Sequence, residues 1–210
     1  EVSYNYDLIK PEDYTALQAF SCGNEQLDNF IHKELISDGE VCTDDGLPFK
    51  VVDLSTNRII GIVSLAASGI IYKVDNYIHV LPAIKIDVFA IDVKYQKMHY
   101  DYASEQSENP DDHFYFSDEV MGTFIRHCRD VSNEKASAHY IVLYADKKAK
   151  RFYVRNFFND FSTFMVKEQN MEINENNPMP PTIPIASGRS VNNDFLNSFK
   201  ILVMALIILS

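Results

Sequence analysis

The strongest hydrophobic pattern in the chain is an alternation of apolar and polar side chains within residues 83–96. Four apolar side chains occupy every second position, and two more fill alternate positions near the end. The first set is Ile84, Ile86, Val88 and Ala90, and the second is Phe89 and Ile91. A strand that is apolar on both faces usually lies centrally in a sheet, and loops after such strands are where α/β proteins place ligands. The pattern predicts a central strand that ends at a functional loop, with an ordinary core strand and loop as the alternative.

Residues 4–35 predict one strand and two helices. Residues 4–9 have the composition of a strand, and Pro11 fits the first turn of a short helix. Gly23 interrupts this pattern, and Asn24 is a favourable N-cap for a second helix. The apolar stripe of that helix has helical spacing and consists of Leu27, Phe30, Ile31 and Leu35.

A hairpin leads from these helices to the strand at residues 83–92. Residues 49–54 and 59–66 are apolar and rich in β-branched side chains, and a short polar turn joins them. The second strand of the hairpin is expected to continue to residue 76. Pro82 is expected to close the connection to the central strand.

An acidic segment follows the central strand. Residues 96–119 contain seven acidic side chains and a single lysine, Lys97, which is typical of a solvated loop. A helix is then expected, capped by Ser117 and with its apolar face running from Val120 to Val131. Acidic side chains in the first turn of this helix suit the positive end of its dipole.

The C-terminal part of the chain predicts two strands separated by a helix. The strands are expected at residues 139–145 and 162–167, and Asp146 is expected to cap the helix. Residues 174–184 are rich in Asn and Pro, and residues 201–209 form an unbroken apolar run. A bilayer-spanning helix needs about 20 residues. The run is therefore expected to pack on the core, to form an oligomer contact or to be foreign to the native protein.

Composition and charge restrict the class of protein. The chain has 210 residues, 46% of them hydrophobic, which fits one globular domain with appendages. Its net charge of −11 opposes non-specific binding to nucleic acids or anionic membranes. The three cysteines and the histidines show no metal-ligand spacing, so reduced thiols and no metal site are expected. No signal segment opens the chain, and we expect a cytoplasmic protein without a membrane partner.

Four short motifs follow one another along the chain. Residues 22–28 read Cys-Gly-x-x-x-Leu-Asp, and residues 60–65 read Ile-Gly-Ile-Val-Ser-Leu. Phe-Ala-Ile-Asp at residues 89–92 is followed by a Tyr-Gln pair, and residues 145–153 end in a Phe-Tyr pair. Together they resemble the toxin-like branch of the GNAT N-acetyltransferases, over residues 4–167.

The resemblance implies an α/β fold and a division of the chain. The GNAT-like acyl-CoA N-acyltransferase fold has a mixed α+β architecture, with a mostly antiparallel sheet flanked by helices. Its sheet is splayed between the fourth and fifth strands, and the fourth strand here is the one at residues 83–92. The acetyltransferase domain would cover residues 1–173. Residues 174–210 would form an Asn/Pro-rich segment and an apolar tail.

The resemblance also implies the chemistry. In this family acetyl-CoA is the cosubstrate, and its pantetheine arm bonds to the backbone of the fourth strand, here Phe89, Ala90 and Ile91. Its pyrophosphate rests on free amides of the following loop, here Gln96, Lys97, Met98, His99 and Tyr100. A substrate amine attacks the thioester, and a tyrosine hydroxyl, here that of Tyr153, protonates the departing thiolate. An aromatic side chain on the buried face of a helix is the alternative for Tyr153.

Two departures from the family pattern concern glycine. The pyrophosphate loop of the family is glycine-rich, whereas this chain has no glycine between Gly69 and Gly122. Side chains in such a loop obstruct the approach of a phosphate to the backbone, and nearby acidic side chains repel it. The second departure is Phe157, which stands where glycine ends the family's Phe-Tyr helix. Asn156 or Asn159 is expected to take the left-handed conformation instead.

Two functions follow from these matches and departures. The first is an N-acetyltransferase that transfers an acetyl group from acetyl-CoA to an amine, with Tyr153 as general acid. Its acceptor is expected to be a small molecule, a peptide or a protein, because the net charge of −11 disfavours tRNA and other nucleic acids. The second is a GNAT-fold domain that has lost CoA binding and serves as a binding or assembly module. The oligomeric state is open, with a homodimer as one alternative.

Overall fold

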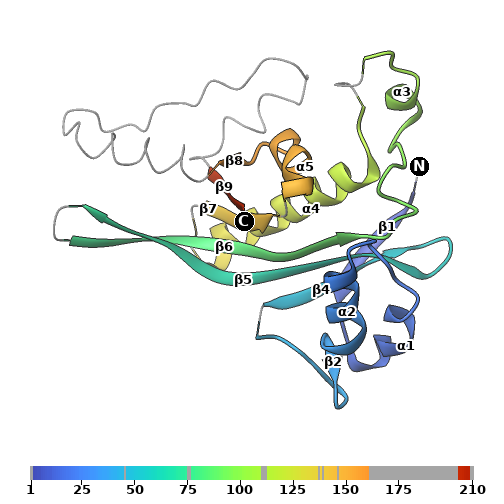
Figure 1. Ribbon diagram of the computed structural model, residues 1–210, viewed down its shortest axis with the longest axis horizontal. Helices are drawn as coiled ribbons and strands as arrows, with labels where there is room; N and C mark the ends of the chain where they lie inside the picture. Colours follow the sequence, from blue (N-terminus) through green and yellow to red (C-terminus); the bar gives the residue numbers. More distant parts are fainter. Residues whose placement is uncertain are drawn as a thin grey trace. The chain divides into compact units, whose positions relative to one another are not determined.

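The computed structural model describes most of the chain up to residue 160 and one strand near its C-terminus (Figure 1). The described residues are 2–44, 46–74, 77–109, 113–136, 138, 140–145, 147–160 and 203–208. The chain divides into two compact units, Glu1–Ala67 with Lys85–Arg129 and Ser68–Ile84 with Asp130–Ser210. Within the described ranges, no helix is both long and apolar enough to cross a membrane. The domain boundary after residue 173 and the cytoplasmic location stay predictions.

A sheet forms the centre of the first unit. Its strands lie in the order β1 (Tyr4–Leu8), β4 (Leu47–Asp53), β5 (Arg58–Val74) and β6 (Tyr77–Ile91). The last two strands continue into the second unit. β4 pairs antiparallel with both β1 and β5, and its register against β5 shifts between Val51 and Val52. The strands predicted at residues 4–9, 49–54, 59–66 and 83–92 are confirmed.

Pro82 does not close the connection before the central strand, which corrects the sequence-based expectation. It lies inside β6, which runs without interruption from Tyr77 to Ile91. A proline keeps an extended φ and removes only one donor from the sheet, so a strand can contain it. β6 is therefore longer than its hydrophobic alternation indicates.

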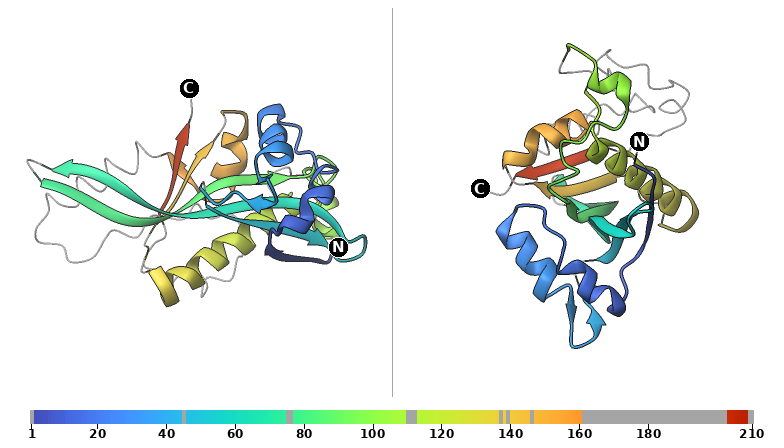
Figure 2. Two further views of the ribbon diagram at one scale, coloured as in Figure 1. Left: turned by 90° about the horizontal axis from the view of Figure 1, so that it is seen from below. Right: turned by 90° about the vertical axis from the view of Figure 1, so that its right-hand side faces the viewer.

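Helices cover both faces of the sheet in the first unit (Figure 2). They are η1 (Pro11–Asp13, a 3₁₀ turn), α1 (Tyr14–Leu17), α2 (Glu25–Lys33) and α4 (Phe116–Val131). On one face, Leu17 of α1 and Ile31 of α2 are buried in a cluster with Ile62 of β5 and Val88 of β6. Asn24 caps α2 as predicted, since its side chain accepts hydrogen bonds from two amides of the first turn.

On the other face, α4 packs an aromatic side chain against the first two strands of the sheet. The Phe124 ring centroid lies 5.2 Å from that of Tyr6 and 5.7 Å from that of Phe49. Phe124 is fully buried, and the same face of the helix also buries Met121 and Cys128. The apolar face predicted for this helix is confirmed at these positions.

The start of α4 differs from the expectation that Ser117 caps the helix. The helix begins at Phe116, so Ser117 lies inside its first turn and Tyr115 is the cap. Asp118 Oδ2 accepts the Tyr115 backbone N–H at 2.9 Å, and the Tyr115 carbonyl accepts the Asp118 N–H at 2.9 Å. A carboxylate three residues after the cap binds the cap's amide more strongly than a hydroxyl does, because its hydrogen bond is charge-assisted.

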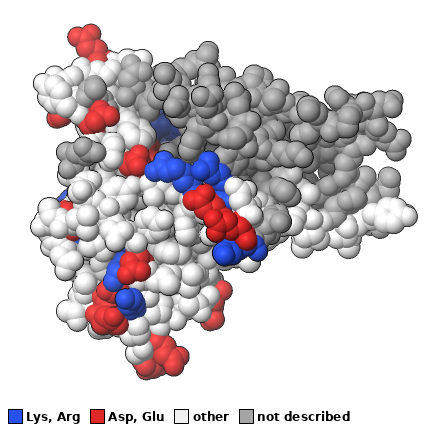
Figure 3. Space-filling view, turned by 180° about the vertical axis from the view of Figure 1, so that it is seen from behind, with Lys and Arg blue, Asp and Glu red and all other residues white. Residues whose placement is uncertain are grey.

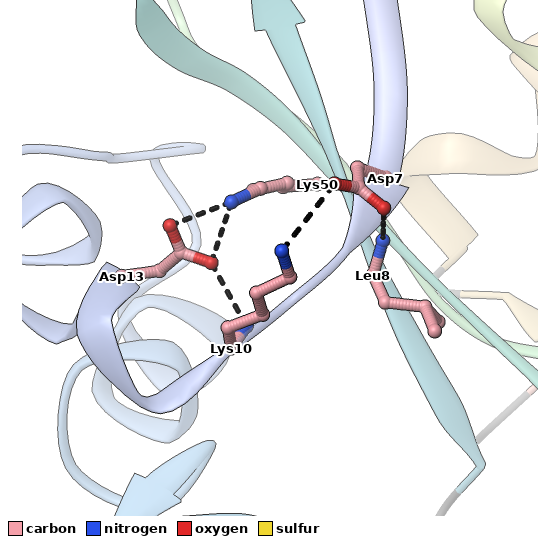
Figure 4. Close-up of polar contacts among 5 residues, drawn as sticks. All are labelled: Asp7, Leu8, Lys10, Asp13 and Lys50. Carbon is pink, nitrogen blue, oxygen red and sulfur yellow. Dashed lines mark hydrogen bonds and ion pairs between the residues drawn. The ribbon is translucent and has the colours of Figure 1, made fainter.

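An ion pair joins the turn after β1 to β4 (Figure 4). Lys50 Nζ lies 2.6 Å from Asp13 Oδ1 and 2.7 Å from Oδ2, and Asp13 also accepts the Lys10 N–H at 2.8 Å. The Lys50 and Asp13 side chains are only 15% and 13% exposed. Water therefore screens this pair less than it screens an ordinary surface pair.

Three short elements complete the first unit. β2 (Ile36–Ser37) and β3 (Glu40–Val41) form an antiparallel hairpin whose turn residues, Asp38 and Gly39, both have positive φ. α3 (Tyr102–Glu105) is a single helical turn inside the acidic segment. These four residues of the segment are therefore helical, whereas its charge predicts a plain solvated loop.

The second unit contains parallel strands. β7 (Tyr140–Ala145) pairs in parallel with β9 (Val203–Ile208), and β9 pairs in parallel with β8 (Asn159–Asp160). The helical elements are η3 (Ser132–Ala136), η4 (Lys147–Ala149) and α5 (Lys150–Arg155). Antiparallel and parallel strands with flanking helices confirm the predicted α/β class. The splay expected between the strands that correspond to β6 and β7 stays a prediction.

Several expectations for the C-terminal part fall on residues outside the described ranges. They concern Asp146, the strand at residues 162–167 and the irregular segment at residues 174–184. The helix expected directly after Asp146 begins as an α-helix only at Lys150. The apolar run at residues 201–209 contains β9, which is paired with β7. Of the three alternatives for this run, the structure supports packing within the fold.

The end of α5 places a phenylalanine in the left-handed conformation, which corrects the expectation for this turn. Phe157 has φ +69°, whereas Asn156 has φ −91° and Asn159 is not among the residues with positive φ. The geometry of the helix end requires a positive φ at residue 157, and this requirement outweighs the poor preference of phenylalanine for that conformation.

The hydrogen bonds around Phe157 explain why this position is fixed. The Phe157 N–H donates to the Val154 carbonyl at 3.1 Å, and the Phe158 N–H donates to the Tyr153 carbonyl at 3.0 Å. This pair of bonds is the Schellman motif, and the accompanying apolar contact is that of the Tyr153 and Phe158 rings, 5.6 Å apart. Moving the left-handed residue would break both bonds.

Replacing Phe157 with glycine is expected to stabilise the protein by about 0.5–1 kcal/mol, because glycine adopts positive φ without a Cβ clash. The side chain that is lost is 57% exposed, so little packing is lost with it. Chemical unfolding of the full chain measures the effect. Asn156→Gly, at negative φ, is the control and should destabilise. A Phe157→Gly protein that is no more stable than wild type would show that the positive φ of Phe157 does not strain the backbone.

Candidate functional site

The end of β6 leads into the turn that the sequence predicts to be functional. Ala90 and Ile91 are both buried and Phe89 is half-buried, so the strand's end is apolar on both faces as predicted. The Asp92 N–H donates to a carbonyl of β5 at 2.9 Å, and the Asp92 carboxylate accepts the Lys94 N–H at 2.9 Å. The turn thus starts from a fixed point on the sheet.

Gln96 closes this turn with its side chain. Gln96 Nε2 donates to the Cys22 carbonyl at 2.7 Å and to the Ile91 carbonyl at 2.9 Å. The Gln96 backbone N–H donates to the Asp92 carbonyl at 3.2 Å. The donors of Gln96 are therefore used to hold the turn against the residues that precede α2.

The Cys-Gly-x-x-x-Leu-Asp motif has a structural role beside this turn. The Asp28 carboxylate accepts the Ser21 hydroxyl at 2.7 Å, the Cys22 N–H at 2.8 Å and the Gly23 N–H at 3.3 Å. Burial acts to raise the pKa of Asp28, but these hydrogen bonds together lower it. Gly23 has φ +78°, and a Cβ atom there would lie 3.0 Å from the Val93 side chain. Sequence reasoning identified this motif, but it did not predict that Asp28 holds the backbone before α2 in place.

The two ends of the acidic segment lie side by side: its start, directly after the turn, is bonded to its end, directly before α4. His99 and Tyr115 form an isolated antiparallel bridge. The Tyr100 N–H donates to the Phe114 carbonyl at 2.9 Å. The predicted pyrophosphate loop is consequently held beside the residues that start α4.

Most backbone amides that a pyrophosphate would need already have acceptors within the protein. In the loop these amides belong to Gln96, Met98 and Tyr100, and at the start of α4 they belong to Tyr115, Phe116, Asp118 and Glu119. An anion site of this kind depends on amides that are free to point at the ligand. The residues found here do not fit a pyrophosphate.

Tyr100, the last residue of the predicted loop, lines a shallow polar hollow of about 380 Å³ together with Tyr4, Glu119, Thr123 and Arg126. The Tyr4 and Thr123 hydroxyls are 2.7 Å apart, and Arg126 Nη2 donates to Glu119 at 3.2 Å. Burial raises the pKa of Tyr4 to about 12. The two charged side chains neutralise each other, so they offer no net charge to an anion.

Asp53, at the end of β4, also contacts the turn after β6. It accepts the Ser55 hydroxyl at 2.7 Å, the Ser55 N–H at 2.8 Å, and the Thr56 and Tyr95 hydroxyls at 3.0 Å. These bonds, led by that of the Ser55 hydroxyl, lower the pKa of Asp53 to about 2. The Tyr95 ring also packs on Phe116, 5.7 Å away. Asp53 therefore links the β4–β5 turn to the start of α4.

Replacing Asp53 with asparagine is expected to change how stability depends on pH. Because the pKa of Asp53 is lowered, its carboxylate stabilises the folded protein at pH values above the ordinary pKa of 3.8. This stabilisation is lost as the pH falls toward 2. Wild type should lose about 1–2 kcal/mol more than Asp53→Asn over that window. Urea unfolding between pH 2 and pH 6 measures this difference. Asp7→Asn, at an exposed carboxylate, is the control, and parallel curves for wild type and Asp53→Asn would contradict the prediction.

Tyr153 lies on α5 in the second unit, whereas the other predicted site residues, from Phe89 to Tyr100, lie in the first. It is 8% exposed, and its ring packs edge-on against Phe152 and Phe158. Burial raises the pKa of Tyr153 to about 12, so its hydroxyl is protonated at neutral pH. Among the described residues, none forms a hydrogen bond with that hydroxyl. Tyr153 is thus a buried aromatic residue on a helix, and its role as general acid stays a prediction.

The thiols of Cys22 and Cys128 are not activated. All three cysteines are free, and Cys128 is buried in the core. Burial raises the pKa of Cys22 to about 11 and that of Cys128 to about 12, which disfavours a nucleophilic thiolate. Within the ranges that the structure describes, no three His, Cys, Asp or Glu side chains are arranged to hold a metal ion.

Comparison with known proteins yields structural matches. Neither a protein-family model nor a curated protein matches the sequence. A Tyr-to-Phe mutant of KacT matches with a TM-score of 0.52 at 19% identity, over 72% of this chain and 84% of that chain. A Tyr-to-Phe mutant of the AtaT toxin, bound to the C-terminus of the antitoxin AtaR and acetyl-CoA, matches with a TM-score of 0.53 at 16% identity, over 74% and 84%. This chain has the GNAT fold.

A third match extends the same result. AtaT complexed with acetyl-methionyl-tRNAfMet has a TM-score of 0.52 at 16% identity, over 72% of this chain and 84% of that chain. The GNAT fold, predicted from four short motifs, is thereby confirmed, and the matched structures are of KacT and AtaT. At this level of identity the similarity establishes the fold.

Proposed function

We propose that this chain is an N-acetyltransferase that transfers an acetyl group from acetyl-CoA to an amine. The observation that supports this most is the GNAT fold, since the AtaT mutant that matches 74% of this chain is bound to acetyl-CoA. Such a transfer needs a strand backbone that pairs with the pantetheine arm and a proton donor for the departing thiolate. We assign the first role to the end of β6 and the second to the protonated hydroxyl of Tyr153.

The proposed chemistry uses few side chains. Acetyl-CoA supplies the acyl group as a thioester. The backbone N–H and C=O groups of an extended strand suit the amides of a pantetheine arm. We assign this role to Phe89, Ala90 and Ile91, and the Ile91 carbonyl would share its acceptor capacity with Gln96 Nε2. As the amine nitrogen bonds to the acyl carbon, the carbon–sulfur bond breaks and the amine releases a proton to solvent. Tyr153 donates its hydroxyl proton to the departing sulfur and is reprotonated from solvent.

The chain fits the two halves of acetyl-CoA unequally. The strand backbone at the end of β6 suits the acyl-pantetheine half. The loop that the resemblance assigns to the pyrophosphate, from Gln96 to Tyr100, uses three of its amides internally. Pyrophosphate binding by Lys97 or His99 stays a prediction, and the hydrogen bonds of the neighbouring residues count against it.

The acceptor that charge favours is a small cationic amine or a basic peptide. The net charge of −11 attracts cations. On the face shown in Figure 3, basic and acidic side chains of the described residues lie side by side and form no continuous basic surface. Such a surface is what binds a nucleic-acid backbone. AtaT has been solved with acetyl-methionyl-tRNAfMet, so aminoacyl-tRNA is the competing acceptor.

Incubation of the full chain with acetyl-CoA and one acceptor at a time tests the proposal. The acceptors are a polyamine, a lysine-rich peptide and aminoacyl-tRNA, and both free thiol release and the mass of the acceptor are measured. We expect acetylation of the polyamine or the peptide. Absence of thiol release with every acceptor, together with no heat on titration with acetyl-CoA, would reject the enzyme. It would leave the binding or assembly module.

A further inference from the structure

We propose that this chain recognises its donor through the acyl-pantetheine half and that the described residues of the loop after β6 and of the start of α4 offer no binding site for the nucleotide pyrophosphate. The inference rests on the proposed function and concerns the class of donor that the enzyme accepts. It predicts that an acyl-pantetheine thioester without a nucleotide is used nearly as well as acetyl-CoA.

The first argument is that the turn and the helix start are bonded to each other. The Phe116 N–H donates to the Met98 carbonyl at 2.8 Å, and the Tyr100 N–H donates to the Phe114 carbonyl at 2.9 Å. A pyrophosphate could reach these amides only after the hydrogen bonds had been broken. Each broken bond would leave a carbonyl without its donor, which opposes the exchange.

The second argument is that an anion already occupies the start of α4. The Asp118 carboxylate accepts the Tyr115 N–H at 2.9 Å, and Asp118 is only 3% exposed. A carboxylate in the first turn satisfies the same free amides and the same dipole that attract a phosphate. The protein's own side chain therefore takes the place of the ligand's charge, and a pyrophosphate beside it would be repelled.

The third argument is that Arg126, Lys94 and Lys97 do not compensate. Arg126 of α4 donates to Glu119 at 3.2 Å and to Thr123 at 2.7 Å. Lys94 and Lys97 are exposed on the turn, where water and salt screen their charges. The segment from residue 96 to residue 119 carries seven acidic side chains against one lysine. Local charge thus opposes a pyrophosphate.

The pantetheine half is independent of these effects. Its amides are neutral, and they pair with strand backbone irrespective of the charge around the loop. The proposal therefore divides the donor into an acyl-pantetheine half, which the chain binds, and a nucleotide half, which remains in solvent.

Steady-state kinetics of the full chain with acetyl-CoA and with S-acetyl-pantetheine test the proposal. We expect kcat/KM values that agree within about tenfold. An enzyme that binds the pyrophosphate through two charge-assisted hydrogen bonds would lose about 100-fold or more with the shorter donor. Tyr153→Phe is the control, and it should slow both donors by the same factor if they react at one site.

Ligand-detected NMR of CoA with the wild-type protein gives a second readout that does not depend on turnover. Saturation should transfer to the geminal methyl groups of the pantetheine arm and not to the adenine protons. A preference of more than tenfold for acetyl-CoA, or equal saturation of the adenine protons, would overturn the inference and leave the proposed function intact. Reaction with neither donor would reject the proposed function and this inference with it.

Discussion

Replacing Tyr153 with phenylalanine is expected to slow acetyl transfer by about 100-fold or more. Proton transfer from a positioned side chain contributes about 10²–10⁴-fold to a rate, and the variant lacks only the hydroxyl that would supply the proton. The ring contacts with Phe152 and Phe158, at 5.1 Å and 5.6 Å, stay in place. The hydroxyl makes no hydrogen bond with the residues that the structure describes, so stability should change by less than about 0.5 kcal/mol.

Turnover at saturating acetyl-CoA measures this effect, and calorimetry measures donor affinity separately. Tyr14→Phe removes a hydroxyl from an exposed ring on α1 and is the matched control. Turnover of the Tyr153 variant equal to that of this control would leave Tyr153 with a packing role only. Because burial raises the pKa of Tyr153 to about 12, ionisation of this hydroxyl should not slow the wild-type enzyme below about pH 11.

Replacing Phe124 with alanine is expected to lower the free energy of unfolding by about 3–5 kcal/mol. The ring is fully buried between α4 and the first two strands, and it lies 5.2 Å from Tyr6, 5.7 Å from Phe49 and 6.3 Å from His127. Its neighbours belong to a helix and a paired sheet, so they cannot collapse fully into the space left behind. Domains are typically stable by about 5–15 kcal/mol, so this loss is a large fraction of the total.

Urea unfolding of the full chain measures the loss, with the slope of the transition used to check that unfolding remains two-state. Phe157→Ala deletes the same ring from a side chain that is 57% exposed and is the control. A Phe124→Ala protein that unfolds within about 1 kcal/mol of wild type would show that the core is not packed on this ring.

The local features of the fold could be predicted because their causes lie within a few residues. Asn24 caps α2 through amides two and three residues away. The alternation in β6 marks its buried face, since side chains on a strand point to opposite sides in turn. The Cys-Gly-x-x-x-Leu-Asp motif could be recognised for the same reason, although its purpose could not. Asp28 serves a turn that comes some 65 residues later in the chain, and only the folded sheet brings the two together.

Two errors of sequence reasoning, at the start of α4 and at the end of α5, share one physical cause. Ser117 has the chemistry of a cap, yet Tyr115 is the cap because the Met98 carbonyl and the Asp118 carboxylate fix where α4 begins. An asparagine suits positive φ better than a phenylalanine, yet Phe157 takes it because the helix end sets the position. In both cases a hydrogen-bond arrangement outweighed a residue preference of about 1 kcal/mol.

The stretch from Ala83 to Gln96 shows which properties the sequence decides and which the tertiary structure decides. The sequence by itself determined that a strand buried on both faces ends at an altered, glycine-free loop, because hydrophobic period and residue type are local properties. Whether that loop offers amides to a ligand was decided only by the tertiary structure. The acceptors of the loop's amides are the carbonyls of Asp92, Tyr95 and Phe114, and Phe114 comes 14 positions after its donor, Tyr100. A hydrogen bond between distant segments leaves no periodic trace in a sequence, so the use of the loop's donors appears only once the chain is folded.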